Sequence, residues 1–123
     1  KIMIVSRCRD IEEFKKVHAQ CENDRIPSAE SILDLDKYCF CFYSDNGEFV
    51  GCIYLEDDEG RVCLSGFAKP KSYDIVIQAI KFISSLFHED DLYSLTDKKS
   101  AIMVLLRCGF KKIDDETYLR KAF

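Results

Sequence analysis

The sequence from Thr96 to Phe110, TDKKSAIMVLLRCGF, predicts a short helix that ends at a Cys-Gly-Phe corner. Its apolar residues recur at helical spacing over Ser100–Arg107, and Gly109 follows at the position where glycine commonly ends a helix. We therefore expect a helix over Ser100–Arg107 that turns into a final strand. Lys98 and Arg107 lie on its solvated side, and its apolar face is formed by Ala101, Ile102, Leu105, Leu106 and Cys108.

Three more segments predict helices. After Asp10, an N-cap type of residue, apolar residues recur three or four positions apart, which predicts an amphipathic helix over 11–21 with His18 on its solvated side. A wide apolar stripe predicts a second helix over 74–87, completed by either Leu86 or Phe87. The stretch SAESILDL predicts a short helix over 28–35 that starts near Pro27 or Ser28.

Short apolar runs predict strands at 2–6, 38–43, 48–55, 61–68 and 92–96, with a last strand or bent pair over 110–123. Asn46-Gly47 is a hairpin signal, and the acidic segment from Asp57 to Gly60 predicts a second, solvated turn rather than an EF-hand. The three middle strands therefore form an antiparallel meander. The predicted order is β-α-α-β-β-β-α-β-α-β, an α/β (α+β) fold.

Composition places the chain among ordinary globular proteins. Its 123 residues suit one domain over 1–123, and 47% hydrophobic with 33% charged residues argues against disorder. The apolar runs are too short for a bilayer helix and no signal-type segment is recognised, so we expect a cytoplasmic protein without membrane contact. A net charge of -4 disfavours nucleic acid as a partner.

Seven cysteines predict free thiols rather than a disulfide framework, because the number is odd and no CxxC occurs. Five of them fall in apolar segments, where cysteine acts as a small hydrophobe. A zinc site needs four ligands at close spacing, and His18 and His88 are far apart in the chain. We therefore expect no metal.

Taken together, three segments resemble the GNAT family, the Gcn5-related N-acetyltransferases that use acetyl-CoA. DNGEFVGCIYL (45–55) is similar to the family's second and third strands, and FAKPKSY (67–73) to the passage that receives the cofactor. SAIMVLLRCGF (100–110) resembles the closing helix, where Ala101, Ile102 and Val104 fall in register with the Gly-Phe corner. The resemblance implies a GNAT-like mixed, mostly antiparallel central sheet flanked by helices.

The resemblance also implies where acetyl-CoA would bind. The positions that match the family's cofactor passage are Phe67, Ala68, Lys71, Ser72, Tyr73, Asp74 and Ile75. The family's glycines at this loop let the backbone approach the diphosphate, whereas this chain has no glycine between Gly66 and Gly109. Asp74 would repel a diphosphate if it pointed into the site, and Lys69 and Lys71 would offset that charge.

The catalytic groups implied by the resemblance are missing. Leu105 stands where many members have a proton-donating tyrosine, and Lys98 stands at the position of the asparagine that opens the helix. The strand RVCLSGFA carries no carboxylate base, and its Cys63 and Ser65 have no histidine partner nearby in the sequence. We assign no catalytic residue. Substitute proton donors would be Tyr73, Tyr93 or Asp97.

Three hypotheses follow. The first is a GNAT-fold domain that has lost acetyl transfer and acts as a binding or assembly module with an unknown protein partner. Degenerate GNAT-like domains of this size also occur in bacteriophage head and virion proteins, and a protein of that type is one setting for this hypothesis. The second is a divergent acetyl-CoA-dependent N-acetyltransferase acting on a small amine, for which the acidic charge favours a cationic amine or polyamine. The third is an α/β domain whose likeness to the family is only architectural.

Overall fold

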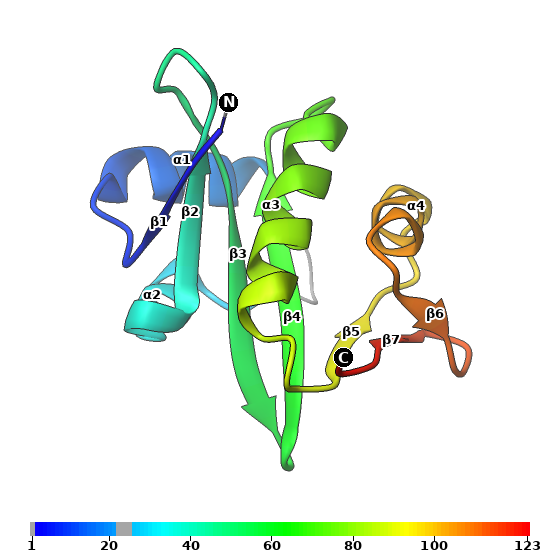
Figure 1. Cartoon of the computed structure of the whole chain (residues 1–123). Coiled ribbons are helices and arrows are strands. Elements are labelled where there is room, and N and C mark those ends of the chain that lie inside the picture. Colours follow the sequence, from blue (N-terminus) through cyan, green and yellow to red (C-terminus); the bar gives the residue numbers. More distant parts are fainter. Residues whose placement is uncertain (1, 22–25) are drawn as a thin grey trace.

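The computed structural model describes residues 2–21 and 26–123, which form one seven-stranded sheet with helices on both faces (Figure 1). Within these residues no helix is long and apolar enough to cross a membrane. The elements in chain order are β1 (Met3–Ser6), α1 (Ile11–Gln20), α2 (Ala29–Leu33), the 3-10 turn η1 (Asp36–Tyr38), β2 (Cys39–Tyr43), β3 (Phe49–Asp58), β4 (Arg61–Ala68), α3 (Tyr73–Leu86), β5 (Leu92–Leu95), α4 (Lys99–Arg107), β6 (Lys111–Lys112) and β7 (Thr117–Arg120).

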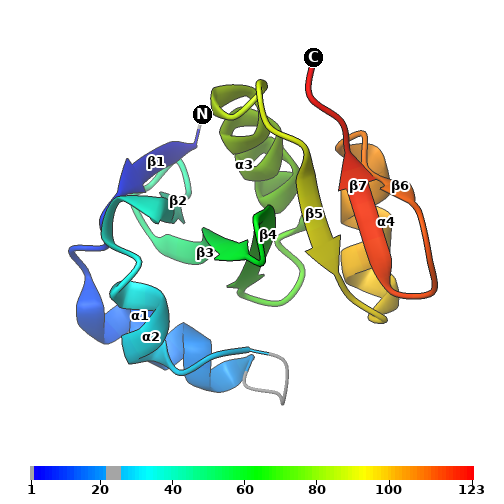
Figure 2. The same ribbon diagram turned by 90° about the horizontal axis from the view of Figure 1, so that it is seen from below.

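The strand order in the sheet is β1-β2-β3-β4-β5-β7-β6, and every neighbouring pair is antiparallel except β4 and β5. This confirms the predicted mixed, mostly antiparallel sheet flanked by helices. Helices α1 and α2 cover one face, and α3 and α4 cover the other (Figure 2). Each face therefore has an apolar core of its own.

Alternation along the strands fills both cores. On β2, Phe40 and Phe42 point to the core under α3 and α4, whereas Cys39, Cys41 and Tyr43 point to the core under α1 and α2. This is the period of two that strand geometry imposes. Because β2 is buried on both faces, all of its residues are apolar, as the run CFCFY predicted.

A β-bulge at Val50 shifts the register between β2 and the start of β3. Tyr43 pairs with Phe49 but Phe42 pairs with Gly51, so Val50 is the extra residue on β3. The Val50 carbonyl accepts the N–H of Lys69 at 2.9 Å, just beyond the end of β4. A side chain at Gly51 would lie 2.3 Å from the Phe67 carbonyl oxygen, so only glycine allows β3 and β4 to approach this closely.

Strands β4 and β5 separate soon after they meet. Their parallel register comprises only Val62 with Leu92 and Cys63 with Tyr93. Beyond Cys63, β4 continues along β3 to Ala68, while β5 continues along β7. The divergence opens the sheet between the two strands, and the opening becomes a cleft.

Several sequence predictions need correction on the helices. Asp10 precedes α1, but its side chain makes no capping hydrogen bond. His18 was expected to be solvated, yet it is buried and its Nε2 lies 2.8 Å from the Pro27 carbonyl oxygen. At α2, by contrast, the Ser28 hydroxyl accepts the N–H of Ser31 as an N-cap should. Of the two alternatives for the helix over 74–87, Phe87 packs on the core and Leu86 is exposed. Leu106, which was predicted on the apolar face of its helix, is exposed.

The turns differ in detail too. The acidic turn is shorter than predicted, because β3 runs through Asp58 and leaves a two-residue turn, Glu59-Gly60, in which both residues have positive φ. In the first hairpin only Gly47 has positive φ, and its N–H donates to the Ser44 carbonyl. The C-terminal segment forms a bent pair of strands, β6 and β7. This is one of the two alternatives that the sequence predicted.

Arg120, at the end of β7, holds the C-terminal end of α3. Its side chain is 6% exposed, and its guanidinium donates to the carbonyls of Ser84 at 2.6 Å, Phe87 at 3.0 Å and Asp90 at 2.6 Å. The last carbonyls of a helix have no partner within it and carry partial negative charge. The Ser84 and Phe87 carbonyls also accept backbone N–H groups, so the buried guanidinium adds a charged donor at this end of α3 and joins it to β7.

Candidate functional site

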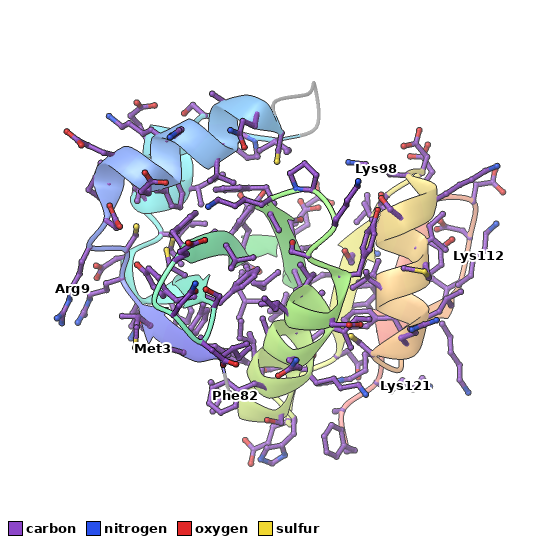
Figure 3. The ribbon with its side chains drawn as sticks, turned by 90° about the horizontal axis from the view of Figure 1, so that it is seen from above. Met3, Arg9, Phe82, Lys98, Lys112 and Lys121 are labelled. Atoms are coloured by element: carbon purple, nitrogen blue, oxygen red, sulfur yellow. The ribbon has the colours of Figure 1, made fainter. Side chains whose placement is uncertain are left out.

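A cleft of about 810 Å³ lies where β4 and β5 diverge. Its walls come from the second half of β4, the loop 69–72, the first turns of α3, the end of β5 and the start of α4. Figure 3 shows Lys98 at the N-terminal end of α4, on the side of the β4–α3 loop. The sequence predicted the elements around this cleft but not its volume.

The structure brings most of the predicted cofactor positions to this cleft. Phe67, Ala68, Lys71, Ser72 and Tyr73 line it, whereas Asp74 and Ile75 do not. Asp74 is exposed on the second residue of α3, so its charge lies outside the lining. That these residues bind a cofactor stays a prediction.

The N-terminal end of α3 lies at the cleft. Tyr73, the first residue of α3, lines the cleft, and the N–H groups of this first turn have no partner within the helix at the end where the helix dipole is positive. The Ser72 hydroxyl donates to the Lys69 carbonyl at 2.6 Å instead of capping the helix. The side chains of Lys69, Lys71 and Lys98 add positive charge to the lining.

The wall of the cleft is poor in groups that transfer protons. Leu105 is 4% exposed and lines the cleft at the position where the family resemblance implies a tyrosine. Among the described residues of the lining, Asp97 is the only carboxylate and no histidine occurs. Of the proposed substitute donors, Tyr73 and Asp97 line the cleft, whereas Tyr93 lies outside it beneath the Arg61 guanidinium at 4.4 Å.

Of the two candidate nucleophiles on β4, only one lines the cleft. Ser65 lines the cleft, but Cys63 does not, and burial raises the pKa of the Cys63 thiol. Tyr54, which also lines the cleft, bonds to Ser65, and burial raises its pKa above the usual range. The Cys63 thiol and the Tyr54 hydroxyl are therefore protonated at neutral pH, and neither is an activated base or nucleophile.

A second group of chemically active side chains lies under α1 and α2. The thiols of Cys39, Cys41 and Cys52 are fully buried, and their sulfur atoms all lie within 4.8 Å of one another. We call these three residues the thiol cluster. The sequence argument against a metal site rested on spacing along the chain, which did not reveal that two strands bring these residues together.

Comparison with known proteins identifies the fold. No protein-family model and no curated protein matches the sequence. Among solved structures, a putative phosphinothricin N-acetyltransferase superposes with a TM-score of 0.71 at 12% identity, covering 100% of this chain and 99% of that one. A GNAT-family acetyltransferase from Staphylococcus aureus Mu50 gives 0.70 at 19% identity, covering 100% of both chains. A spermidine/spermine N-acetyltransferase from Vibrio cholerae gives 0.61 at 13%, covering 93% of this chain and 80% of that one.

These likenesses cover 93–100% of this chain and 80–100% of the neighbours, so this protein has the fold of the GNAT acetyltransferases. The fold predicted from the Ala-Ile register and the Gly-Phe corner is thereby confirmed. At 12–19% identity the likeness establishes architecture. The activity has to be argued from the cleft, because one fold hosts many functions.

Proposed function

We propose that this domain binds a coenzyme A thioester in the β4–β5 cleft, does not transfer its acetyl group, and serves as a binding or assembly module. The observation that carries the proposal is the composition of the cleft. The anion-receiving first turn of α3 is present, while Leu105 occupies the wall where the resemblance implies a proton donor.

Three features support binding. The volume of about 810 Å³ falls in the range of roughly 300–1,000 Å³ common for small-molecule sites. The N–H groups of the first turn of α3 can donate hydrogen bonds to an anion whatever their side chains are, so anion binding at this turn does not require the missing loop glycines. Asp74 lies outside the lining, and the lining holds three lysines against the single carboxylate of Asp97, so the local charge favours a diphosphate.

The missing groups support loss of transfer. Direct transfer to an amine needs a base for the amine proton and an acid for the departing thiolate, and each such group contributes about 10²–10⁴ in rate. Leu105 has no proton to give, and β4 carries no carboxylate between Arg61 and Ala68. The lining therefore holds neither group where the resemblance implies it.

A second candidate is an active N-acetyltransferase on a cationic amine. It is favoured by Asp97 and Tyr73, which both line the cleft and would act as base and acid. The net charge of -4 would attract a polyamine, and one structural neighbour is a spermidine/spermine N-acetyltransferase. The two candidates share the cofactor and differ in turnover.

Thermal unfolding with acetyl-CoA tests binding. A ligand at 100 times its dissociation constant stabilises the native state by about 2.7 kcal/mol, so the melting temperature should rise by several degrees. Ser72→Glu places a carboxylate at the first turn of α3 and should abolish the rise. Gln78→Glu, which adds the same charge on the same helix outside the cleft, is the matched control and should preserve it.

Chromatographic detection of free coenzyme A in the presence of spermidine then separates the two candidates. Binding without turnover supports the module, and turnover supports the enzyme. An unchanged melting temperature at millimolar acetyl-CoA would overturn both. The assembly role and a bacteriophage setting are predictions of their own, tested by the mass of the protein in solution and by identification of any protein that purifies with it.

A further inference from the structure

The thiol cluster is assembled by the pairing of β2 with β3. Cys39 and Cys41 lie two positions apart on β2 and therefore point to the same face. Cys52 on β3 is the register partner of Cys41. The sulfur atoms of Cys39 and Cys52 lie 3.5 Å apart across the strands.

The spacing of the three sulfur atoms matches the ligand set of a small thiophilic ion. With metal–sulfur bonds of about 2.3 Å, three sulfurs around one ion lie about 4 Å from one another. The cluster has all three within 4.8 Å and one pair at 3.5 Å. Adjustments of less than an ångström would bring every sulfur to bonding distance.

The surroundings exclude water and harder ligands. The cluster lies in the core under α1 and α2, next to apolar residues such as Phe14, Val17 and Ile32. All three cysteines are fully buried. A buried site made of sulfur alone selects soft ions over magnesium or calcium, which prefer oxygen.

A fourth thiol and backbone donors complete the site. Cys8, in the segment after β1, interacts through its thiol with Cys41 and is partly exposed, so it connects the cluster to solvent. The Cys8 N–H donates to the Cys39 sulfur, and the Asp10 N–H donates to the Cys8 sulfur. Such N–H donors stabilise negative sulfur and hold metal ligands in place.

We propose that Cys39, Cys41 and Cys52 bind one thiophilic d10 cation, Zn²⁺ or Cu⁺, with Cys8 available as a fourth ligand. Three thiols release three protons as they form three metal–sulfur bonds, and no electron is transferred. Zn²⁺ with three thiolates has a net charge of -1, and addition of Cys8 gives four-coordinate zinc. Cu⁺ is satisfied by three sulfurs.

The test uses the whole reduced protein under anaerobic conditions, titrated with Zn²⁺ alone or with Cu⁺ against a chromophoric chelator. One ion per chain should bind. Cys41→Ala and Cys52→Ala should each weaken binding by at least about 100-fold. Cys63→Ala, a buried thiol outside the cluster, is the matched control and should leave affinity unchanged. Cys8→Ser distinguishes the ions, because it should weaken zinc and spare copper.

X-ray absorption of the loaded wild-type protein provides a measurement that does not depend on variants folding. Three or four sulfur neighbours at about 2.3 Å would support the site. Oxygen or nitrogen as the main neighbours would overturn it. So would equal loss of affinity in Cys63→Ala, or a Cys39–Cys52 disulfide in protein purified without oxidant.

Discussion

Replacement of Arg120 by methionine tests how α3 is held. The change keeps most of the apolar stem and removes the guanidinium that donates to the carbonyls of Ser84, Phe87 and Asp90. Residues 88–90 are exposed, so water can replace the bonds near the turn. Ser84 is buried, and its carbonyl would lose its charged donor and keep only the longer hydrogen bond from the Phe87 N–H at 3.2 Å.

The magnitude follows from these environments. Loss of the charged hydrogen bond to the buried Ser84 carbonyl costs about 1.5–3 kcal/mol, and each rehydrated bond costs about 0.5–1 kcal/mol. The sum is a loss of about 3 kcal/mol in the free energy of unfolding. That is a large share of the roughly 5–15 kcal/mol that stabilises a typical domain.

Urea denaturation followed by circular dichroism measures the effect. We expect the midpoint to fall and the slope to stay unchanged, which identifies lost stability rather than an altered unfolded state. Arg120→Lys keeps the charge but not the planar fork, and should lose an intermediate amount. Arg107→Met, on the exposed side of α4, should change stability by less than about 0.5 kcal/mol. A loss below 1 kcal/mol in Arg120→Met would refute the assigned role.

Three further perturbations test the cleft and the C-terminal loop. Leu105→Tyr supplies an acid at the cleft wall, so the rate of coenzyme A release in the presence of an amine at alkaline pH should rise by about 100-fold. If this variant binds acetyl-CoA but its rate does not rise, the missing catalytic group lies elsewhere in the cleft. Gly66→Ala would put its Cβ 2.4 Å from the Cys52 carbonyl oxygen, so the free energy of unfolding should fall by at least about 1 kcal/mol. Urea denaturation would show this as a lower midpoint. The hydroxyl and N–H of Thr117 and the N–H of Glu116 lower the pKa of Asp114, so its contribution to stability is present at neutral pH and lost as pH falls below about 4. Asp114→Ala should flatten the pH dependence of the urea midpoint in that range, and an unchanged dependence would contradict the assignment.

The parts of the fold that sequence predicted best are those set by local periodicity. Helix α4 lies where the spacing over Ser100–Arg107 placed it, and the meander β2–β3–β4 follows from short apolar runs separated by turn signals at Asn46-Gly47 and Asp57–Gly60. Exposure was predicted less well at helix edges, as His18 and Leu106 show. Whether such a residue is buried depends on the neighbouring segment that covers it, and periodicity in one helix does not contain that information.

The site divides in the same way. The family resemblance grouped Ser72 with its neighbours, and most of that contiguous segment lines the cleft, whereas its role in cofactor binding stays a prediction. The thiol cluster was missed because its members meet through strand register, with Cys52 opposite Cys41. Alternation does place Cys39 and Cys41 on one face, and their pairing with Cys52 across the hairpin is the signal that could have found the cluster.

The backbone pairing between β4 and β5 is limited to two residue pairs. Strands β1–β4 lie on one side of this seam and β5, β7 and β6 on the other (Figure 1), while the core under α3 and α4 spans both sides. Few backbone bonds join the two sides within the sheet, so we expect the seam to open locally at a lower free energy than global unfolding requires. A molecule bound in the cleft would contact both sides of the seam. It would act as a cross-link between them, and amide exchange along β5 and the second half of β4 should slow when the cleft is filled.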